Sequence, residues 1–402
     1  MTRTRTALII GGGIAGPATA MALQKVGIDP VIYEAYPAGA YGTGAFLTLA
    51  PNGIDALRIL GADKPALAAG FPTPAITLRS YTGKRLGQTR TGGSLPDGTT
   101  SHTIKRADLY RVLLDEAASR GLRIEHGKRL IAAEQVGDRV QAAFADGSTA
   151  QGDVLIGCDG VHSTVRSIID PEAPTPTYAG LLNTGGYAHG VQAGNGPGHY
   201  EMIFGKRAFF GYVAAPGGQV WWFANLPRRG DPARGQTQAL SDRAWRAQLA
   251  EAYAGDAGPA TDLIEATPQL MATTPVHTLP HLPGWYHRQM IVIGDAAHAP
   301  SPTSGQGASL AIEDAVVLAQ CLRDQPSAQA AFAAFEAARR PRVERIIKWA
   351  ARINNSKAAG PIARIFRDAM LPVILAMTAN SKAQKQAYDY HINWDGPTPA
   401  AA

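Results

Sequence analysis

The 402-residue sequence has little cysteine and no long apolar segment. Its two cysteines, Cys158 and Cys321, are too few for a disulfide framework or a zinc cluster, and this favours a reducing compartment. No stretch reaches the ~18 apolar residues that a membrane-spanning helix needs, and the apolar run near the N-terminus is too short for a secretory signal. We therefore expect a cytoplasmic protein with no stable membrane insertion and no metal site.

Charged residues are also sparse, at 17%, whereas 45% of the residues are hydrophobic, and this balance excludes a disordered chain. The 38 basic and 32 acidic side chains give a net charge of +6. This small excess suits an anionic cofactor or substrate and gives no reason to expect nucleic acid as a partner. The length allows two or three domains, each with its own core.

The order of predicted elements indicates an α/β protein whose chain is interrupted by a second domain. A short strand, a glycine turn and a helix begin the sequence, and "PVIYEAYP" supplies the next strand. After about Thr177 the strands become rich in aromatic residues and typical of an antiparallel sheet; three of them span "HYEMIFGKRAFFGYVAAPGGQVWWFANLP". A buried strand near Ile291 then returns to the first sheet. From Ala308 onward the chain is predicted to be largely helical, with a break at Pro341.

Gly11, Gly13 and Gly16 form a G-x-G-x-x-G motif between the first strand and its helix. Gly11 allows the tight turn, Gly13 lets the backbone approach a diphosphate, and Gly16 lets the helix pack on the strand. Glu34 ends the second strand, where its carboxylate can accept hydrogen bonds from a ribose diol. An acid at this position disfavours a 2′-phosphate, so the motif predicts bound FAD or NAD rather than NADP.

Two later glycine turns also follow predicted strands. In "GCDGVHSTVR", Asp159 and Gly160 follow "DVLIG"; the acid could accept from ribose or ribityl hydroxyls, orient an arginine, or belong to an ordinary acidic turn. In "IVIGDAAHAPSPTSGQGASLAIEDA", Gly294 and Asp295 follow the returning strand, and a pliable path leads to the helix that starts near Ala308. The N-terminus of that helix offers unpaired N–H groups and the positive end of a dipole.

Together, these three motifs in this order resemble those of the FAD-dependent aromatic hydroxylases of the para-hydroxybenzoate hydroxylase type, which are single-component flavoprotein monooxygenases. "RADLYRVLL", which begins at Arg106, is similar to the family's arginine-x-x-leucine-x-x-x-leucine helix. The resemblance covers nearly the whole chain. It implies that FAD is held by Gly11, Gly13, Ile14, Ala15, Gly16, Glu34, Arg106, Asp159, Gly160, Gly294, Asp295, Pro302, Gly305, Gly307, Ala308 and Ser309.

On this interpretation the fold class is α/β with an α+β insert. A Rossmann-like FAD-binding domain would comprise residues 1–75, 101–177 and 274–345. Residues 76–100 and 178–273 would form the inserted antiparallel-sheet substrate domain, and residues 346–402 would form a C-terminal helical region.

The implied enzyme is a single-component, FAD-dependent monooxygenase. It would use NADPH or NADH and dioxygen to hydroxylate an aromatic or other electron-rich ring through a flavin hydroperoxide. The flavin carries the chemistry, so no catalytic side chain is expected. No second strand, glycine motif and helix are visible, and we therefore expect NAD(P)H to be a transient co-substrate. The other partners would be a small ring molecule and dioxygen, and the protein would be a monomer or a homodimer.

Other activities of the same fold remain open. They are an FAD-dependent epoxidase, an antibiotic-modifying hydroxylase, a flavin-dependent reductase or dehydrogenase, and a non-enzymatic FAD- or NAD-binding sensor. "WWFANLP" is similar to the tryptophan-rich motif of flavin-dependent halogenases, but Ala224 stands where that motif has its second tryptophan. A halogenase is therefore less favoured than a hydroxylase.

The inserted sheet and the C-terminal helices hold further candidate residues. The substrate-pocket candidates are His189, Phe210, Tyr212 and Trp222, and alternation leaves open which face of the sheet lines the pocket. We expect His298 to be structural rather than a base. The arginine-rich run at 339–348 is interpreted as a solvated helix face.

Overall fold

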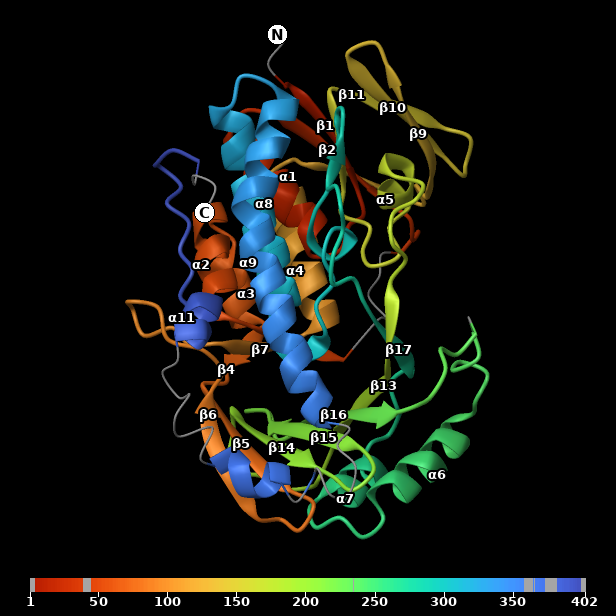
Figure 1. Cartoon of the computed structure of the whole chain (residues 1–402), viewed down its shortest axis with the longest axis vertical. Coiled ribbons are helices and arrows are strands. Elements are labelled where there is room, and N and C mark those ends of the chain that lie inside the picture. The colour runs from red at the N-terminus through yellow and green to blue at the C-terminus, as the bar shows by residue number, and fades with distance from the viewer. Residues whose placement is uncertain are drawn as a thin grey trace.

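A six-stranded, mainly parallel sheet forms the base of the predicted nucleotide-binding region (Figure 1). The computed structural model describes residues 4–38, 45–233, 235–357, 364, 366–372 and 382–398. In spatial order the strands are β18 (Tyr286–His287), β19 (Met290–Val292), β12 (Val154–Gly157), β1 (Thr6–Ile10), β2 (Asp29–Glu34) and β8 (Arg123–His126). Only the edge pair β18–β19 is antiparallel among these strands. The sheet thus assembles strands from remote parts of the chain, and β19 returns beside β12 as predicted.

Helices and two small sheets surround this sheet. The helices are α1 (Ala15–Lys25), α2 (Pro51–Leu60), α3 (Asp63–Ala68), α4 (Arg106–Ser119), α5 (Thr164–Ile169), α8 (Gly307–Asp324) and α9 (Ala328–Lys357), with the short 3-10 turns η1 (Gly294–Ala296) and η2 (Pro302–Ser304). The small sheets consist of β3 (Phe46–Leu49), β7 (His102–Lys105) and β4 (Gly70–Pro72), and of β11 (Thr149–Gly152), β10 (Arg139–Phe144) and β9 (Leu130–Val136). No helix among the described residues is long and apolar enough to cross a membrane.

The inserted sheet lies at the other end of the molecule and has seven strands (Figure 1). Their order is β17 (Thr274–Thr278), β13 (Thr177–Ala188), β16 (Val220–Pro227), β15 (Phe209–Ala214), β14 (His199–Phe204), β5 (Ala75–Ser80) and β6 (Arg85–Arg90). All neighbouring pairs are antiparallel except β14–β5. The predicted three strands after residue 198 are confirmed as β14, β15 and β16. The helices α6 (Asp242–Tyr253) and α7 (Ala260–Glu265) cover one face of this sheet.

Helix α9 does not break at Pro341, contrary to the prediction. A proline inside a helix removes one backbone hydrogen bond, and other contacts must offset that loss. Here Arg339 and Arg342, on either side of the proline, bind acids of α8 and hold both halves of the helix in place. The C-terminal helical region also includes α11 (Lys382–Tyr388), whereas residues 358–363, 365, 373–381 and 399–402 of the predicted region lie outside the described residues.

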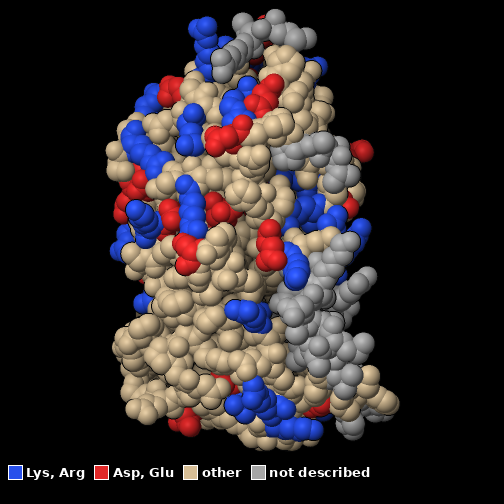
Figure 2. All heavy atoms as spheres, turned by 90° about the vertical axis from the view of Figure 1, so that its left-hand side faces the viewer, with Lys and Arg blue, Asp and Glu red and all other residues tan. Residues whose placement is uncertain are grey.

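Basic and acidic side chains are mixed on the surface of the protein. On the face drawn in Figure 2, basic and acidic side chains are interspersed in the upper half, and uncharged atoms cover much of the middle. This distribution agrees with the small net charge of +6.

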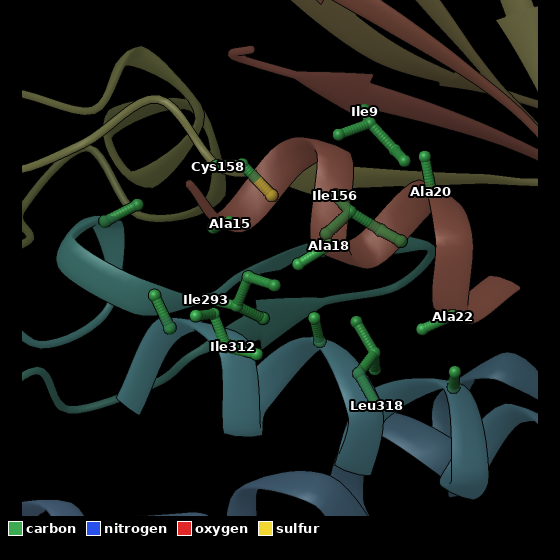
Figure 3. Close-up of a cluster of buried hydrophobic side chains, with 14 of the residues drawn as sticks. Ile9, Ala15, Ala18, Ala20, Ala22, Ile156, Cys158, Ile293, Ile312 and Leu318 are labelled. Carbon is green, nitrogen blue, oxygen red and sulfur yellow. The ribbon is translucent and has the colours of Figure 1, made fainter. Parts of the chain in front are cut away.

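The small residues of α1 allow it to pack closely against the sheet and α8. Ala15, Ala18 and Ala22 recur at helical spacing, and Figure 3 shows them in one apolar cluster with Ile312 and Leu318 of α8. Interiors are packed as densely as organic crystals, so this contact has no room for larger side chains.

We expect Ala18→Leu to lower the free energy of unfolding by about 1–3 kcal/mol, because the added atoms would overfill the fully buried contact of α1. Ala118→Leu, on the exposed side of α4, is the matched control and should change the free energy of unfolding by about 0.5 kcal/mol or less. Urea unfolding of both variants measures the difference. Equal losses would show that the α1 contact is not tightly packed.

Candidate functional site

The glycine loop after β1 has the shape of a diphosphate cradle. Gly11 has a φ of +105°, and a Cβ there would lie 2.5 Å from the carbonyl oxygen of Cys158. A Cβ on Gly16 would lie 2.0 Å from the carbonyl oxygen of Gly11. Gly13 is less crowded, because the nearest atom to its Cβ position is the hydroxyl oxygen of Tyr110 at 3.9 Å, an ordinary van der Waals distance. No side chain caps α1 at Ile14, so its first N–H groups are available to an anion.

Glu34, at the end of β2, accepts hydrogen bonds from backbone groups in and beside the glycine loop. Its Oε2 accepts a hydrogen bond of 2.7 Å from the N–H of Gly12, and its Oε1 accepts one of 2.8 Å from the N–H of Tyr36. A carboxylate has about four acceptor positions. The remaining ones are free to accept from a ribose diol.

Arg106 and Asp295 lie on the opposite side of the same site. Arg106, at the start of α4, donates from Nε to the hydroxyl oxygen of Tyr110 over 2.7 Å. Burial raises the pKa of Asp295, and the positive charge of Arg106 offsets only part of this rise. A Cβ on Gly307 would lie 3.8 Å from Oδ1 of Asp295, so the carboxyl group lies beside the start of α8. The tertiary structure thus brings the predicted arginine and acid together.

Asp159 acts as a helix cap in this structure. Its Oδ2 accepts from the N–H groups of Thr164 and Val165, at 2.7 and 3.1 Å, and its Oδ1 accepts from the Ser163 hydroxyl at 2.5 Å. Burial raises the pKa of Asp159 despite these bonds. Ser163 caps α5, and its side chain accepts from the N–H of Arg166. Contact of Asp159 and Gly160 with a cofactor stays a prediction.

The stretch from Pro302 to Ser309 forms η2, a turn at Gly305 with a φ of +61°, and the start of α8. No side chain caps the N-terminus of α8. The hydroxyl oxygen of Ser309 accepts from the N–H of Ala50 at 3.1 Å, so this side chain joins α8 to α2. What Gly307, Ala308 and Ser309 offer to a ligand is therefore their backbone, whose N–H groups favour a negative charge.

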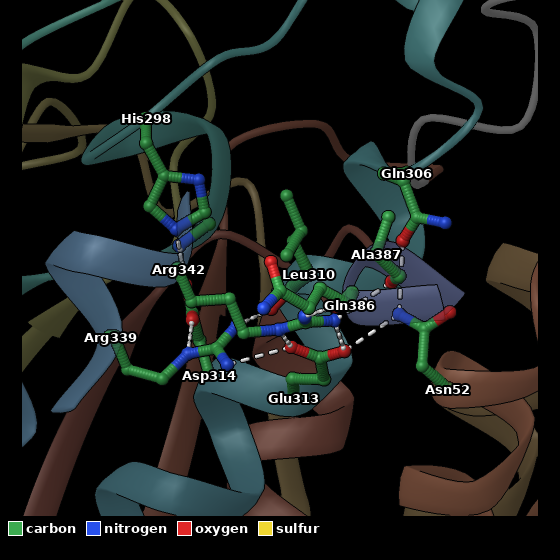
Figure 4. Close-up of polar contacts among 11 residues, drawn as sticks. Asn52, His298, Gln306, Leu310, Glu313, Asp314, Arg339, Arg342, Gln386 and Ala387 are labelled. Atoms are coloured by element: carbon green, nitrogen blue, oxygen red, sulfur yellow. Dashed lines mark hydrogen bonds and ion pairs between the residues drawn. The ribbon is translucent and has the colours of Figure 1, made fainter. Parts of the chain in front are cut away.

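Asp314 of α8 fixes the turn that carries Asp295. Its Oδ2 accepts from the N–H of Gly294 at 2.9 Å and lies 2.6 Å from Nε2 of His298, and its Oδ1 accepts from Nε of Arg339 at 2.7 Å (Figure 4). Burial alone would raise the pKa of Asp314, but the charges of His298 and Arg339 hold it at about 2. His298 is buried and contacts Asp314, which is consistent with the predicted structural role.

Glu313 continues this network toward the loop before α8. Arg342 binds it with two bonds of 2.9 and 2.8 Å, and Arg339 forms an ion pair with it at 2.7 Å (Figure 4). Asn52 donates to both Glu313 and Gln306, at 2.6 and 2.9 Å. The interpretation of residues 339–348 as a solvated face was therefore wrong for the two arginines, because both are buried against acids of α8. The sequence did contain a signal for this burial. Arg339 and Arg342 are three residues apart, so they lie on one face of α9, where both can reach the adjacent acids of α8.

Three of the four pocket candidates do not face this site. Phe210, Tyr212 and Trp222 belong to the core beneath α6 and α7, where Phe210 stacks on Trp222 at 5.4 Å. The fourth, His189, is exposed near Gln219. We therefore withdraw Phe210, Tyr212 and Trp222 as pocket residues: α6 and α7 cover one aromatic face of the sheet, and that face becomes core.

Tyr187, Trp221 and Phe223 on the opposite face of the sheet gather with Phe46 of β3, and we call these four rings the aromatic shelf. Phe46 lies 5.6 Å from Trp221 and 6.0 Å from Phe223, and the Tyr187 hydroxyl donates to the carbonyl of residue 45. Sequence reasoning missed this group, although alternation places Trp221 and Phe223 opposite Trp222.

The shelf is close to the start of α8. Strand β3 leads from Phe46 to Ala50, which bonds to Ser309, over about 13 Å of extended chain. On the neighbouring strand, Lys105 places its ammonium 4.5 Å from the Tyr187 ring and 5.2 Å from the Trp221 ring. The next residue, Arg106, contacts Tyr110 instead, whose hydroxyl oxygen lies near Gly13 of the glycine loop.

Known proteins with this arrangement are flavoenzymes. The family described as "FAD binding domain" matches residues 4–350. FAD-dependent urate hydroxylase of Klebsiella pneumoniae is 32% identical over 350 residues, which cover 85% of this chain and 87% of that protein. Salicylate hydroxylase of Pseudomonas putida is 30% identical over 368 residues, covering 84% and 82%. The crystal structure of Klebsiella pneumoniae HpxO complexed with FAD and uric acid has a TM-score of 0.84 at 27% identity and covers 95% of this chain and 96% of that chain.

The chain therefore belongs to the FAD-dependent aromatic hydroxylase family. It is an FAD-dependent monooxygenase, and the predicted family, fold class and FAD cofactor are confirmed.

We expect Arg339→Met to lower the free energy of unfolding by about 3–5 kcal/mol, because it removes a buried partner of both Glu313 and Asp314. Lys348→Met breaks an exposed pair with Glu344 and is the control, with an expected loss of about 1 kcal/mol or less. Chemical denaturation gives both values. Similar losses in the two variants would contradict a central role for Arg339.

Proposed function

We propose that FAD extends from the glycine loop to the start of α8, with its ribose on Glu34 and its ribityl chain on Asp295. The observation that carries this proposal is the meeting of two helix N-termini, those of α1 and α8, at Gly294. A Cβ on Gly294 would lie 3.2 Å from the Cβ of Ala311 and 3.5 Å from that of Ala15. Two helix N-termini with uncapped N–H groups favour an extended anionic ligand between them.

The protein would supply binding and orientation, since FAD, when bound, supplies the chemistry of accepting a hydride from NADPH or NADH and using dioxygen. The N–H groups at Gly307 and Ala308 would stabilise negative charge at the ring system placed there. Asp295 would accept from a ribityl hydroxyl. The aromatic shelf would hold the organic ring and exclude water from it.

We further propose that the substrate is a small planar ring that carries an acidic group. The shelf offers flat apolar surfaces for such a ring. Lys105 has no acidic partner among the described residues, so its charge is available to a carboxylate or an ionised hydroxyl. Relatives named as urate, salicylate and 6-hydroxynicotinate hydroxylases or monooxygenases act on rings of this kind. The protein itself would be cytoplasmic, which its two buried, unpaired cysteines support. It would be a monomer or a homodimer.

We expect the FAD-loaded enzyme to oxidise NADH or NADPH faster with an acidic ring such as salicylate than with its neutral amide. Mass spectrometry after turnover in ¹⁸O₂ should show one labelled oxygen in the product. Lys105→Met should raise KM for the acid about tenfold, because a charge-assisted contact is lost, and should leave KM for the amide unchanged. NAD(P)H oxidation without labelled product from any ring would overturn the proposal, and an equal KM effect on acid and amide would overturn the role of Lys105.

We expect Asp295→Ala to weaken FAD binding about tenfold or more, since it removes an acceptor for the ribityl chain. Asp138→Ala, at an exposed position, is the matched control and should bind FAD like the wild type. Flavin fluorescence during titration of the FAD-free protein measures both affinities. Unchanged affinity in Asp295→Ala would show that this carboxylate does not hold the cofactor.

A further inference from the structure

Tyr110 lies one helical turn after Arg106 on α4, and its side chain faces the glycine loop. Its hydroxyl oxygen is 3.9 Å from the position that a Cβ on Gly13 would occupy. The side chain is only 6% exposed, so its hydroxyl group is directed into the site rather than toward bulk water. A ligand that approaches the Gly13 backbone must therefore also approach this hydroxyl.

The hydroxyl group of Tyr110 accepts one hydrogen bond and can still donate another. Its oxygen accepts the Nε–H of Arg106 at 2.7 Å, and no described residue accepts the hydroxyl hydrogen. Burial raises the pKa of Tyr110 above its ordinary value, although Arg106 opposes the rise. The group is therefore a neutral phenol at physiological pH and keeps its hydrogen to donate. A buried donor without a partner is unfavourable, which indicates that a ligand atom completes this bond.

The position of Tyr110 along the site identifies the ligand group. Both Glu34 and Asp295 act electrostatically on the Tyr110 hydroxyl, so it lies within range of the acids at the two ends of the site. Those acids are the proposed partners of the ribose and of the ribityl chain. In a dinucleotide, the group between these two sugars is the diphosphate.

We propose that Tyr110 donates its hydroxyl hydrogen to an oxygen of the FAD diphosphate and is a cofactor-binding residue. The inference rests on the proposed binding path of FAD. Arg106 strengthens the bond, because a cation that donates to a phenol oxygen makes the phenol a better donor. The diphosphate thus receives donors from the glycine loop on one side and from the Arg106–Tyr110 pair on the other.

The test is FAD and ADP binding to the FAD-free protein carrying Tyr110→Phe, which keeps the ring and removes the hydroxyl group. We expect about tenfold weaker binding of FAD and of ADP, and unchanged binding of adenosine, which has no phosphate. Tyr253→Phe is the matched control. It also removes a buried hydroxyl bond, to the carbonyl of Phe209, but in the core beneath α6. It should bind all three ligands like the wild type.

A second comparison separates direct contact from an effect on Arg106. In the Arg106→Met background, Tyr110→Phe should still weaken ADP binding severalfold. Loss of that effect would show that Tyr110 acts only by orienting Arg106 and would overturn the inference, as would equal ADP affinity in Tyr110→Phe and the wild type. If the wild type bound ADP but not FAD, the proposed function would fail, and the ADP comparison would still decide the role of Tyr110.

Discussion

The site depends on a buried ion network at the start of α8. Asp314 receives the N–H of Gly294, His298 and Arg339, and Glu313 receives Arg339, Arg342 and Asn52 (Figure 4). Removing charges from water is costly unless every acid is paired in good geometry. The pairs satisfy that condition only when η1, α8 and α9 are all in place. The network therefore specifies the position of the turn that carries Asp295 as much as it stabilises the fold.

This arrangement explains how a site can be divided between the two ends of a long chain. The glycine loop follows β1, and the turn at Gly294 follows β19, with β12 between these strands in the sheet. Parallel strands end at the same edge, so loops far apart in sequence meet there. Arg106 enters from a third segment and lies close enough to Asp295 to affect its pKa.

The two faces of the inserted sheet carry different groups of aromatic residues. One face packs beneath α6 and α7 and stabilises the domain through rings such as Trp222. The other carries Trp221 and Tyr187 beside the cation of Lys105. Adjacent residues of one strand thus have opposite tasks, because successive side chains point to opposite faces. An amphipathic helix after the sheet decides which face becomes core.

Local patterns in the sequence determined the β-α-β unit, the strand and acid that follow it, the insertion of an aromatic sheet and the return of a buried strand. The roles of Gly11 and Gly16 could be predicted from the sequence because they depend only on the steric space near the backbone. Only the tertiary structure decided the roles of Arg339 and Arg342, the continuity of α9 through Pro341, which aromatic face of the sheet becomes core and the approach of Tyr110 to Gly13. These features depend on which elements pack together, and the partners lie tens to hundreds of residues apart, beyond the reach of any periodic pattern.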